Sequence, residues 1–106
     1  MILTEMSRTF IHGFEWDLRK ARSNLEKHGV TFDQAARVFQ DPMALTEFDD
    51  EHSHVEERWI TLGMDRAGTL LVVCHTYKET AGSEARIRVI SARRASKREA
   101  ATYGKR

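Results

Sequence analysis

The sequence predicts an α+β protein in which helices pack on one face of an antiparallel sheet. Two stretches near the N-terminus and one at the C-terminus carry helix-capping residues and helix-forming or apolar residues at helical spacing. Between them, residues 43–91 read as strands separated by short polar turns, which is the pattern of hairpin-linked strands. With a short strand before the first helix, the predicted order is β-α-α-β-β-β-β-α.

The first strand and the first helix have recognisable ends. Residues 10–17 (FIHGFEWD) alternate and are rich in aromatic side chains, so they predict a short strand. Residues 1–9 show no period and are expected to form a loose N-terminal extension. Asp17 occupies the N-cap position of a helix over residues 18–28, and Gly29 stands where helices commonly end in a left-handed conformation.

A second helix follows directly. Thr31 and Gln34 have the spacing of a capping box, and apolar residues continue at helical spacing up to Phe39. The pair Asp41-Pro42 ends this helix, because proline has no amide proton and restricts the residue before it.

The rest of the chain predicts four strands and a final helix. Residues 43–48 form a short strand, residues 55–63 alternate, and residues 69–77 are apolar on both faces, as a central strand requires. Residues 85–91 (ARIRVIS) place two arginines on one face and two aliphatic side chains on the other. Residues 92–104 are rich in helix formers and end at a glycine.

Size and composition predict one domain without a membrane segment. A chain of 106 residues with 41% hydrophobic residues can bury one modest core, so residues 1–106 are expected to form a single domain. The apolar runs are far shorter than the roughly 18 residues that span a bilayer, and no signal-peptide core is present, which predicts a cytoplasmic protein. Cys74 is the single cysteine and is expected to act as a small core residue.

Charges are separated along the chain although the formal net charge is only +1. Residues 47–57 contain six acidic residues and no Lys or Arg, whereas residues 86–106 contain eight Lys or Arg against Glu99. This asymmetry predicts an anionic partner for the C-terminal part, and phosphate backbones are the commonest candidate. A solvated charged face is the alternative interpretation.

The sequence lacks the motifs of several enzyme classes. It contains no P-loop, no dinucleotide-binding glycine-rich turn, no G-x-S-x-G elbow and no H-E-x-x-H motif. The Asp, Glu and His residues of segment 49–57 match no familiar ligand spacing and are interpreted as a solvated acidic turn. We therefore expect neither a metal nor another cofactor.

The basic C-terminal segment has the side chains that binding to RNA requires. Arg86 and Arg88 share one face of a predicted strand, and Arg93 and Arg94 follow it, so their guanidinium groups can reach phosphate oxygens. Arg93 and Arg94, at the predicted junction of strand and helix, are expected to converge on one phosphate. Aromatic side chains that can stack on unpaired bases are Trp59, Tyr77 and Tyr103.

Cleavage of RNA without a metal requires a base for the 2′-hydroxyl, a cation for the phosphorane and an acid for the leaving 5′-oxygen. Glu57 is the candidate base, with His52 or His75 as alternatives. Arg88 and Arg93 are the candidate cations. The candidates for the acid or a positioning group are His75, Lys78 and Tyr103.

Four segments of the sequence carry a resemblance to a known family: FEWDLRKARSNLEKHGVTFDQAARVFQDP, DDEHSHVEERWITLG, LLVVCHTYK and RIRVISARRASKRE. In this order they resemble the BrnT family of toxins, the toxic half of BrnT-BrnA type II toxin-antitoxin modules. The resemblance implies a RelE-like fold and a ribonuclease that inhibits translation by cutting RNA, and we expect this endoribonuclease to need no metal. It also implies neutralisation by a DNA-binding BrnA-like antitoxin, through which alone the toxin would reach operator DNA.

The family's R-I-I-S-A-R-R-A signature falls on residues 88–95, and its E-x-R motif falls on Glu56 and Arg58. Many members have T-x-R after the central strand, whereas this chain has Lys78 there, which keeps the charge but loses the bidentate fork. An alternative function is a non-catalytic basic domain that binds the antitoxin and co-represses the operon. The residues expected to be catalytic are Glu57, His75, Arg88 and Arg93. Those expected to bind RNA are Arg58, Lys78, Arg86, Arg94 and Tyr103.

Overall fold

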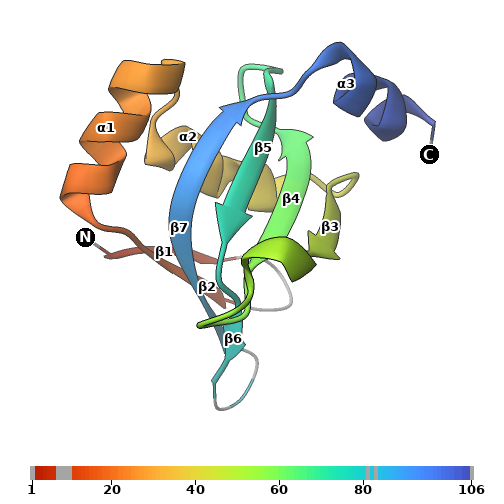
Figure 1. Ribbon diagram of the computed structural model, residues 1–106. Coiled ribbons are helices and arrows are strands. Elements are labelled where there is room, and N and C mark those ends of the chain that lie inside the picture. Colours follow the sequence, from red (N-terminus) through yellow and green to blue (C-terminus); the bar gives the residue numbers. More distant parts are fainter. Residues whose placement is uncertain (1, 7–10, 81, 83, 106) are drawn as a thin grey trace.

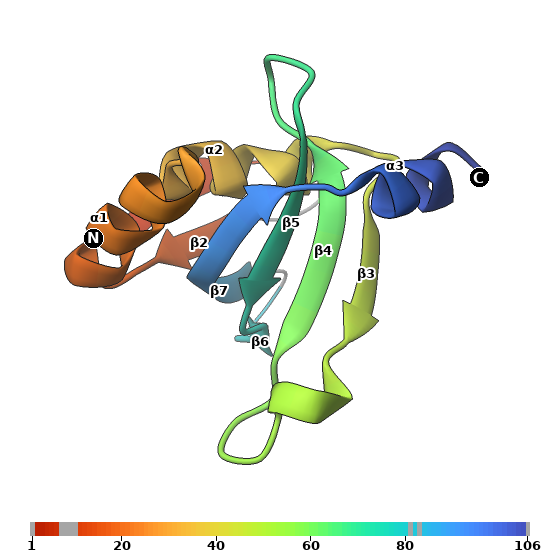
Figure 2. The same ribbon diagram turned by 45° about the horizontal axis from the view of Figure 1, so that its top comes forward.

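A twisted mixed sheet with two helices on one face forms the fold (Figures 1 and 2). The computed structural model describes residues 2–6, 11–80, 82 and 84–105. The strands are β1 (Ile2–Met6), β2 (Ile11–Glu15), β3 (Leu45–Phe48), β4 (Trp59–Met64), β5 (Leu70–His75), β6 (Lys78–Glu79) and β7 (Glu84–Arg94). The helices are α1 (Leu18–His28), α2 (Phe32–Arg37) and α3 (Lys97–Gly104), with short 3₁₀ helices η1 (Val38–Gln40) and η2 (Asp50–His52).

The predicted α+β class and element order are confirmed, and the structure adds β1 and β6. The strands run in the order β1-β2-β7-β5-β4-β3, with β6 also paired to β7. Neighbours from β3 to β7 are antiparallel, as predicted, whereas β2 lies parallel to the first half of β7. A parallel pair joins strands that are remote in sequence, so no hairpin signal marks it.

The N-terminus differs from the expectation of a loose extension over residues 1–9. Residues 2–6 form β1, which pairs antiparallel with β2 from Ile2↔Glu15 to Met6↔Ile11. Backbone hydrogen bonding to an open sheet edge can order a segment that has no apolar period of its own. Residues 1 and 7–9 lie outside the described part of the chain.

The predicted helix caps are confirmed. The Asp17 carboxylate accepts hydrogen bonds from the backbone amides of Arg19 and Lys20, at 2.8 and 3.2 Å. Gly29 ends α1 with φ of 67°, a left-handed conformation that favours glycine. Thr31 and the side chain of Gln34 form the capping box of α2.

Strand β7 organises the sheet because different partners occupy its two edges. Along one edge it pairs with β6 and then β5, and along the other it pairs with β2 only from Glu84 to Arg88. Beyond Arg88, the buried side chain of Asn24 in α1 makes the hydrogen bonds to this edge of β7 that a neighbouring strand would otherwise make. Its amide nitrogen donates to the carbonyl of Ala92 (2.7 Å) and to that of Val30 (3.0 Å), and its oxygen accepts from the Ala92 amide (3.0 Å).

The core lies between the sheet and helices α1 and α2. Its largest fully buried apolar side chains include Phe14, Phe32, Leu71 and Ile87. A Cβ atom at Gly63 would lie 2.7 Å from a methyl group of Val38, so glycine is required where η1 packs directly on β4. In the described part of the chain, no helix covers the opposite face of the sheet over β5 and β7 (Figure 1).

The predicted element boundaries that differ most from the structure are the junction of β7 with α3 and the start of β4. Residues 92–94 belong to β7, because Arg93 and Arg94 pair with Val72 and Leu71 of β5; helix α3 begins only after its N-cap, Ser96. Strand β4 begins at Trp59 instead of residue 55, because the preceding residues form a closed loop. Helix α3 leaves the end of β7 and lies beside β4 (Figure 2). Of the helices in the described segments, none has the length and hydropathy to cross a bilayer.

Candidate functional site

An open pocket with charged walls lies where β2, β6 and β7 meet the loop before β4. Its volume is about 430 Å³, and we refer to it as the ionic pocket. The strands and the loop before β4 each contribute charged side chains to its walls, and these include both acids and bases. The acidic lining residues are Glu15, Glu56 and Glu57, and the basic ones are Lys78, Arg86 and Arg88, with Thr76 and Tyr77 beside them.

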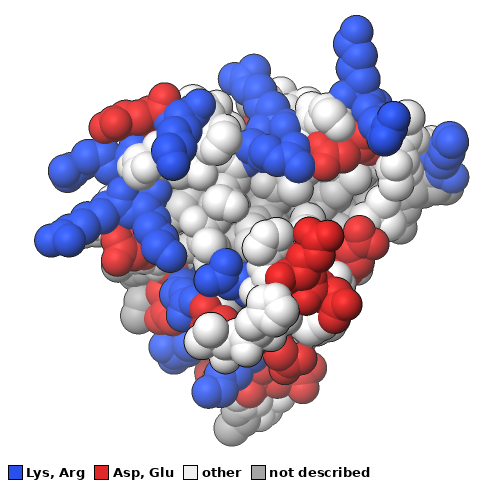
Figure 3. All heavy atoms as spheres, viewed as in Figure 1, with Lys and Arg blue, Asp and Glu red and all other residues white. Residues whose placement is uncertain are grey.

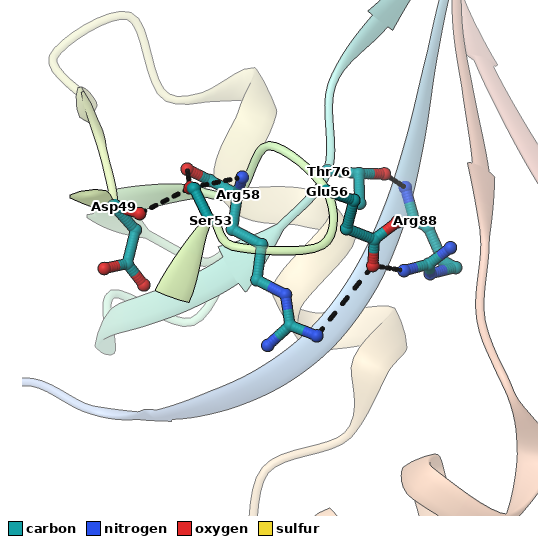
Figure 4. Close-up of polar contacts among 6 residues, drawn as sticks. All are labelled: Asp49, Ser53, Glu56, Arg58, Thr76 and Arg88. Atoms are coloured by element: carbon teal, nitrogen blue, oxygen red, sulfur yellow. Dashed lines mark hydrogen bonds and ion pairs between the residues drawn. The ribbon is translucent and has the colours of Figure 1, made fainter. Parts of the chain in front are cut away.

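Arg88 is held from two sides in this pocket (Figure 4). Its backbone amide donates to the hydroxyl of Thr76 at 3.1 Å, and its guanidinium donates to the carboxylate of Glu56. The same oxygen of Glu56 lies 3.8 Å from the guanidinium of Arg58. One carboxylate therefore bridges two arginines, while the Arg88 side chain stays 39% exposed and accessible to a ligand.

A closed loop over residues 49–58 positions Glu56 and Arg58. The backbone amide of Asp49 donates to the Arg58 carbonyl at 2.8 Å. The Ser53 hydroxyl donates to the Asp49 carbonyl at 2.5 Å and accepts from the Arg58 amide at 3.0 Å. These bonds fix both ends of the loop, so the Glu56 carboxylate is directed toward β7 (Figure 4).

The parallel pairing of β2 with β7 brings a further carboxylate to the ionic pocket. Glu15 lies opposite Arg88 in the register, and its carboxylate is 3.7 Å from the guanidinium of Arg86. With three acids and three bases in its lining, the pocket is formally neutral when empty. A phosphate can enter by replacing a carboxylate on an arginine, since both groups accept the same forked hydrogen bonds.

The structure brings together several residues that the sequence suggested. Glu57, Lys78, Arg86 and Arg88 line the ionic pocket, and Arg58 adjoins it through Glu56. Tyr77, suggested as a base-stacking residue, lies beside them in the same lining, and the remaining suggested residues lie elsewhere.

Arg93 is engaged with α3 and not with Arg88. Its guanidinium makes two hydrogen bonds of 2.8 Å to the carboxylate of Glu99, which raises the pKa of Arg93 and lowers the pKa of Glu99 to about 2. At about 3.3 Å per strand residue, the backbones of Arg88 and Arg93 are roughly 16 Å apart. Arg88 and Arg93, the two candidate cations for the phosphorane, therefore lie in different parts of β7, and only Arg88 lines the ionic pocket. Arg94 is exposed at the end of β7.

His75 and Tyr103 also lie outside the ionic pocket. His75 is 1% exposed, and its Nδ1 lies 2.9 Å from the Thr76 carbonyl and its Nε2 lies 2.7 Å from the Thr61 hydroxyl. Burial lowers the pKa of His75 to about 4, so it is uncharged near neutral pH and poorly suited to act as the acid. The Tyr103 hydroxyl donates to the Asp41 carboxylate at 2.6 Å, which ties α3 to the turn before β3.

Sequence reasoning assigned no role to Glu56, Glu15 or Thr76. In a strand beginning at residue 55, Glu56 and Glu57 would point to opposite faces of the sheet. That prediction contains no reason to choose Glu56 as the functional carboxylate. In the loop that the structure shows, Glu56 contacts Arg88 and Glu57 is exposed. The E-x-R spacing of Glu56 and Arg58 was the available signal.

On the side of the molecule that Figure 3 shows, most basic and most acidic side chains gather in different parts. Lys and Arg side chains lie over α1 and around the junction of β7 with α3, and acidic side chains lie toward β3 and η2.

Comparisons with known proteins agree on one family. Residues 16–99 match the family model described as "Ribonuclease toxin, BrnT, of type II toxin-antitoxin system". The structure is similar to the crystal structure of the Brucella abortus ribonuclease toxin BrnT, with a TM-score of 0.52 and 22% sequence identity over 84% of this chain and 99% of that one. None of the curated proteins matches this sequence.

Proposed function

We propose that this chain, which belongs to the BrnT family of ribonuclease toxins of type II toxin-antitoxin systems, cleaves RNA in the ionic pocket without a metal ion. The observation that carries the proposal is the pairing of Arg88 with Glu56 in an open pocket. A guanidinium with a carboxylate beside it supplies the cation and the base that RNA cleavage requires.

The proposed reaction begins when a phosphate replaces Glu56 on Arg88. The displaced carboxylate then takes the proton of the 2′-hydroxyl, and the 2′-oxygen forms a bond to phosphorus. Arg88 and Arg86 stabilise the charge of the phosphorane. Lys78 gives a proton to the 5′-oxygen as its bond to phosphorus breaks, leaving a 2′,3′-cyclic phosphate and a 5′-hydroxyl. Glu57 lines the same pocket and is the alternative base.

We further propose that cleavage inhibits translation and that a BrnA-like antitoxin silences the toxin by covering the ionic pocket. A protein segment that pairs its acidic groups with Arg86 and Arg88 would exclude phosphate. Operator DNA would be bound only through the antitoxin. A gene for a small DNA-binding protein beside the gene for this chain is the expected companion.

The test measures cleavage of an unstructured RNA by the folded, antitoxin-free chain in excess EDTA. We expect fragments with 2′,3′-cyclic phosphate ends, and Arg88→Ala should lower kcat by about 100-fold or more, because the developing charge loses its donor. Glu56→Gln should lower kcat by about 100-fold or more while tightening RNA binding, because it removes a base and also a competitor for Arg88.

Glu79→Gln on β6 is the matched control, since Glu79 is exposed and does not line the ionic pocket. Its kcat should stay within a few-fold of the parent value. Glu57→Gln assigns the base: a loss confined to E57Q would give that role to Glu57. Intact RNA in the parent reaction, or full activity of Arg88→Ala, would contradict the proposal, and activity abolished by EDTA would contradict its metal independence.

A further inference from the structure

A second open pocket lies directly beside the ionic pocket. Its volume is about 360 Å³, its walls are predominantly apolar, and we refer to it as the aromatic pocket. The side chains that line it are Phe39, Thr46, Trp59, His75 and Tyr77. Tyr77 lines both pockets, so they meet at its side chain.

The walls of the aromatic pocket are held in place by contacts behind them. The Trp59 ring packs edge-on against Phe48, with ring centres 5.1 Å apart. The Phe39 ring packs edge-on against His75, with centres 4.8 Å apart, and also contacts Phe14. Rings fixed in this way form a site before a ligand arrives and lose little side-chain freedom on binding.

The polar groups of this pocket are neutral. The Thr76 carbonyl can only accept a hydrogen bond, so Nδ1 of His75 carries the proton and Nε2 accepts from the Thr61 hydroxyl. The Thr61 hydroxyl is in turn 2.8 Å from that of Thr46. Because burial lowers the pKa of His75, its ring adds no charge near neutral pH. A neutral ring suits these walls better than a phosphate does.

We propose that the aromatic pocket binds one unpaired nucleobase of the RNA strand whose phosphate lies at Arg88. The inference rests on the proposed cleavage in the ionic pocket, and it adds a base-binding subsite to it. Continuity through Tyr77 favours a nucleotide, because base and phosphate of one strand must occupy adjoining sites of different chemistry. Aromatic rings stack on any base, so this subsite would give affinity with little sequence preference.

The test measures the affinity of the full chain for a labelled single-stranded 2′-O-methyl RNA, which lacks the attacking hydroxyl and is not cleaved. Loss of stacking costs about 1–3 kcal/mol per base, so Trp59→Leu and Tyr77→Ala should each raise Kd about 5- to 150-fold. The salt dependence of Kd should not change, because no cation is removed.

Tyr77→Phe serves as the control. It keeps the ring and should retain the parent Kd within about twofold, since stacking needs the π-face and not the hydroxyl. Tyr77 is 43% exposed, so Tyr77→Ala tests the pocket even where Trp59→Leu fails to fold.

The outcomes separate the two proposals. Weaker binding by Tyr77→Ala supports the base subsite even if the parent does not cleave RNA. If the parent cleaves RNA and both pocket variants bind like the parent, the base subsite is wrong and the cleavage proposal stands. Unchanged RNA binding together with lost binding to the antitoxin would assign the pocket to an apolar side chain of that protein and overturn the inference.

Discussion

Three contacts fix the state of the His75 side chain. The Thr61 hydroxyl and the Thr76 carbonyl take its two ring nitrogens, and the Phe39 ring packs against it. A charged imidazole here would lose much of its hydration and would have to break the hydrogen bond that Nε2 accepts. The folded chain therefore favours neutral His75, which links its stability to pH.

We expect acid to destabilise the fold through His75. Its pKa is about 4 in the folded chain and 6.5 in the reference state, so the unfolded chain binds more protons between these values. The contribution is complete above pH 6.5 and is lost as the pH falls toward 4, by about 2–3 kcal/mol between pH 7.5 and 4.5. Urea unfolding at both pH values checks this.

Between pH 7.5 and 4.5, the free energy of unfolding of His75→Gln should fall by about 2–3 kcal/mol less than that of the parent, because the variant lacks the titrating imidazole. Replacement of the exposed His28 by Gln is the matched control and should reproduce the pH dependence of the parent. Equal pH dependence of H75Q and the parent would contradict the prediction. Glu99 acts in a lower window, since its pKa of about 2 makes its own contribution disappear only below pH 4.5.

Side-chain roles were predictable where strand periodicity held. The alternation of β7 correctly placed Arg86 and Arg88 together, away from the buried Ile87. It could not place Glu56, because Ser53 closes a loop there, nor Arg93, because its partner Glu99 comes from α3. Both depend on tertiary contacts that no local pattern encodes.

Helix α1 completes the sheet as well as covering it. Its caps were readable from Asp17 and Gly29, whose conformational demands are local. The role of Asn24 was not, because its partners Ala92 and Val30 belong to other elements. A side-chain amide on a free strand edge satisfies backbone groups that would otherwise be buried without partners.

Asn24→Ala should lower the free energy of unfolding by about 3 kcal/mol, because it leaves buried backbone groups at Ala92 and Val30 unsatisfied. Asn24→Asp should be at least as damaging, since a carboxylate cannot donate to the two carbonyls. Ser23→Ala, on the exposed neighbouring position of α1, should change stability by less than about 0.5 kcal/mol. Urea denaturation checks all three, and a tolerated Asn24→Ala would contradict the edge role.

Over the whole molecule, the balanced ionic pocket and the main groups of exposed cations lie in different regions. The ionic pocket is formally balanced, whereas Lys and Arg gather around the junction of β7 with α3 (Figure 3). Exposed cations such as Lys97 and Arg98 attract a phosphate backbone over a longer range, whereas a balanced pocket would exchange one anion for another at short range. The fold class was predictable from the capped helices and the alternating strands of the sequence. The spatial arrangement of the charged side chains was not, because it depends on the strand order β1-β2-β7-β5-β4-β3.

This division predicts different effects for α3 and for the ionic pocket. Lys97→Ala with Arg98→Ala removes two exposed cations from α3. It should reduce the slope of log Kd against log salt for single-stranded RNA by up to about 1.4, because each neutralised phosphate contributes about 0.7. The value of kcat at saturating RNA should stay unchanged, in contrast to the loss expected for Arg88→Ala.

The charge-conserving pair Lys97→Arg and Arg98→Lys is the control, and it should keep the parent slope because counterion release depends on charge and not on side-chain geometry. Titrations of labelled 2′-O-methyl RNA between low and moderate salt give the slopes, and initial rates at saturating RNA give kcat. A large fall in kcat for the alanine pair would place α3 in the chemistry. That outcome would contradict the separate roles of α3 and the ionic pocket, because Lys97 and Arg98 do not line the pocket.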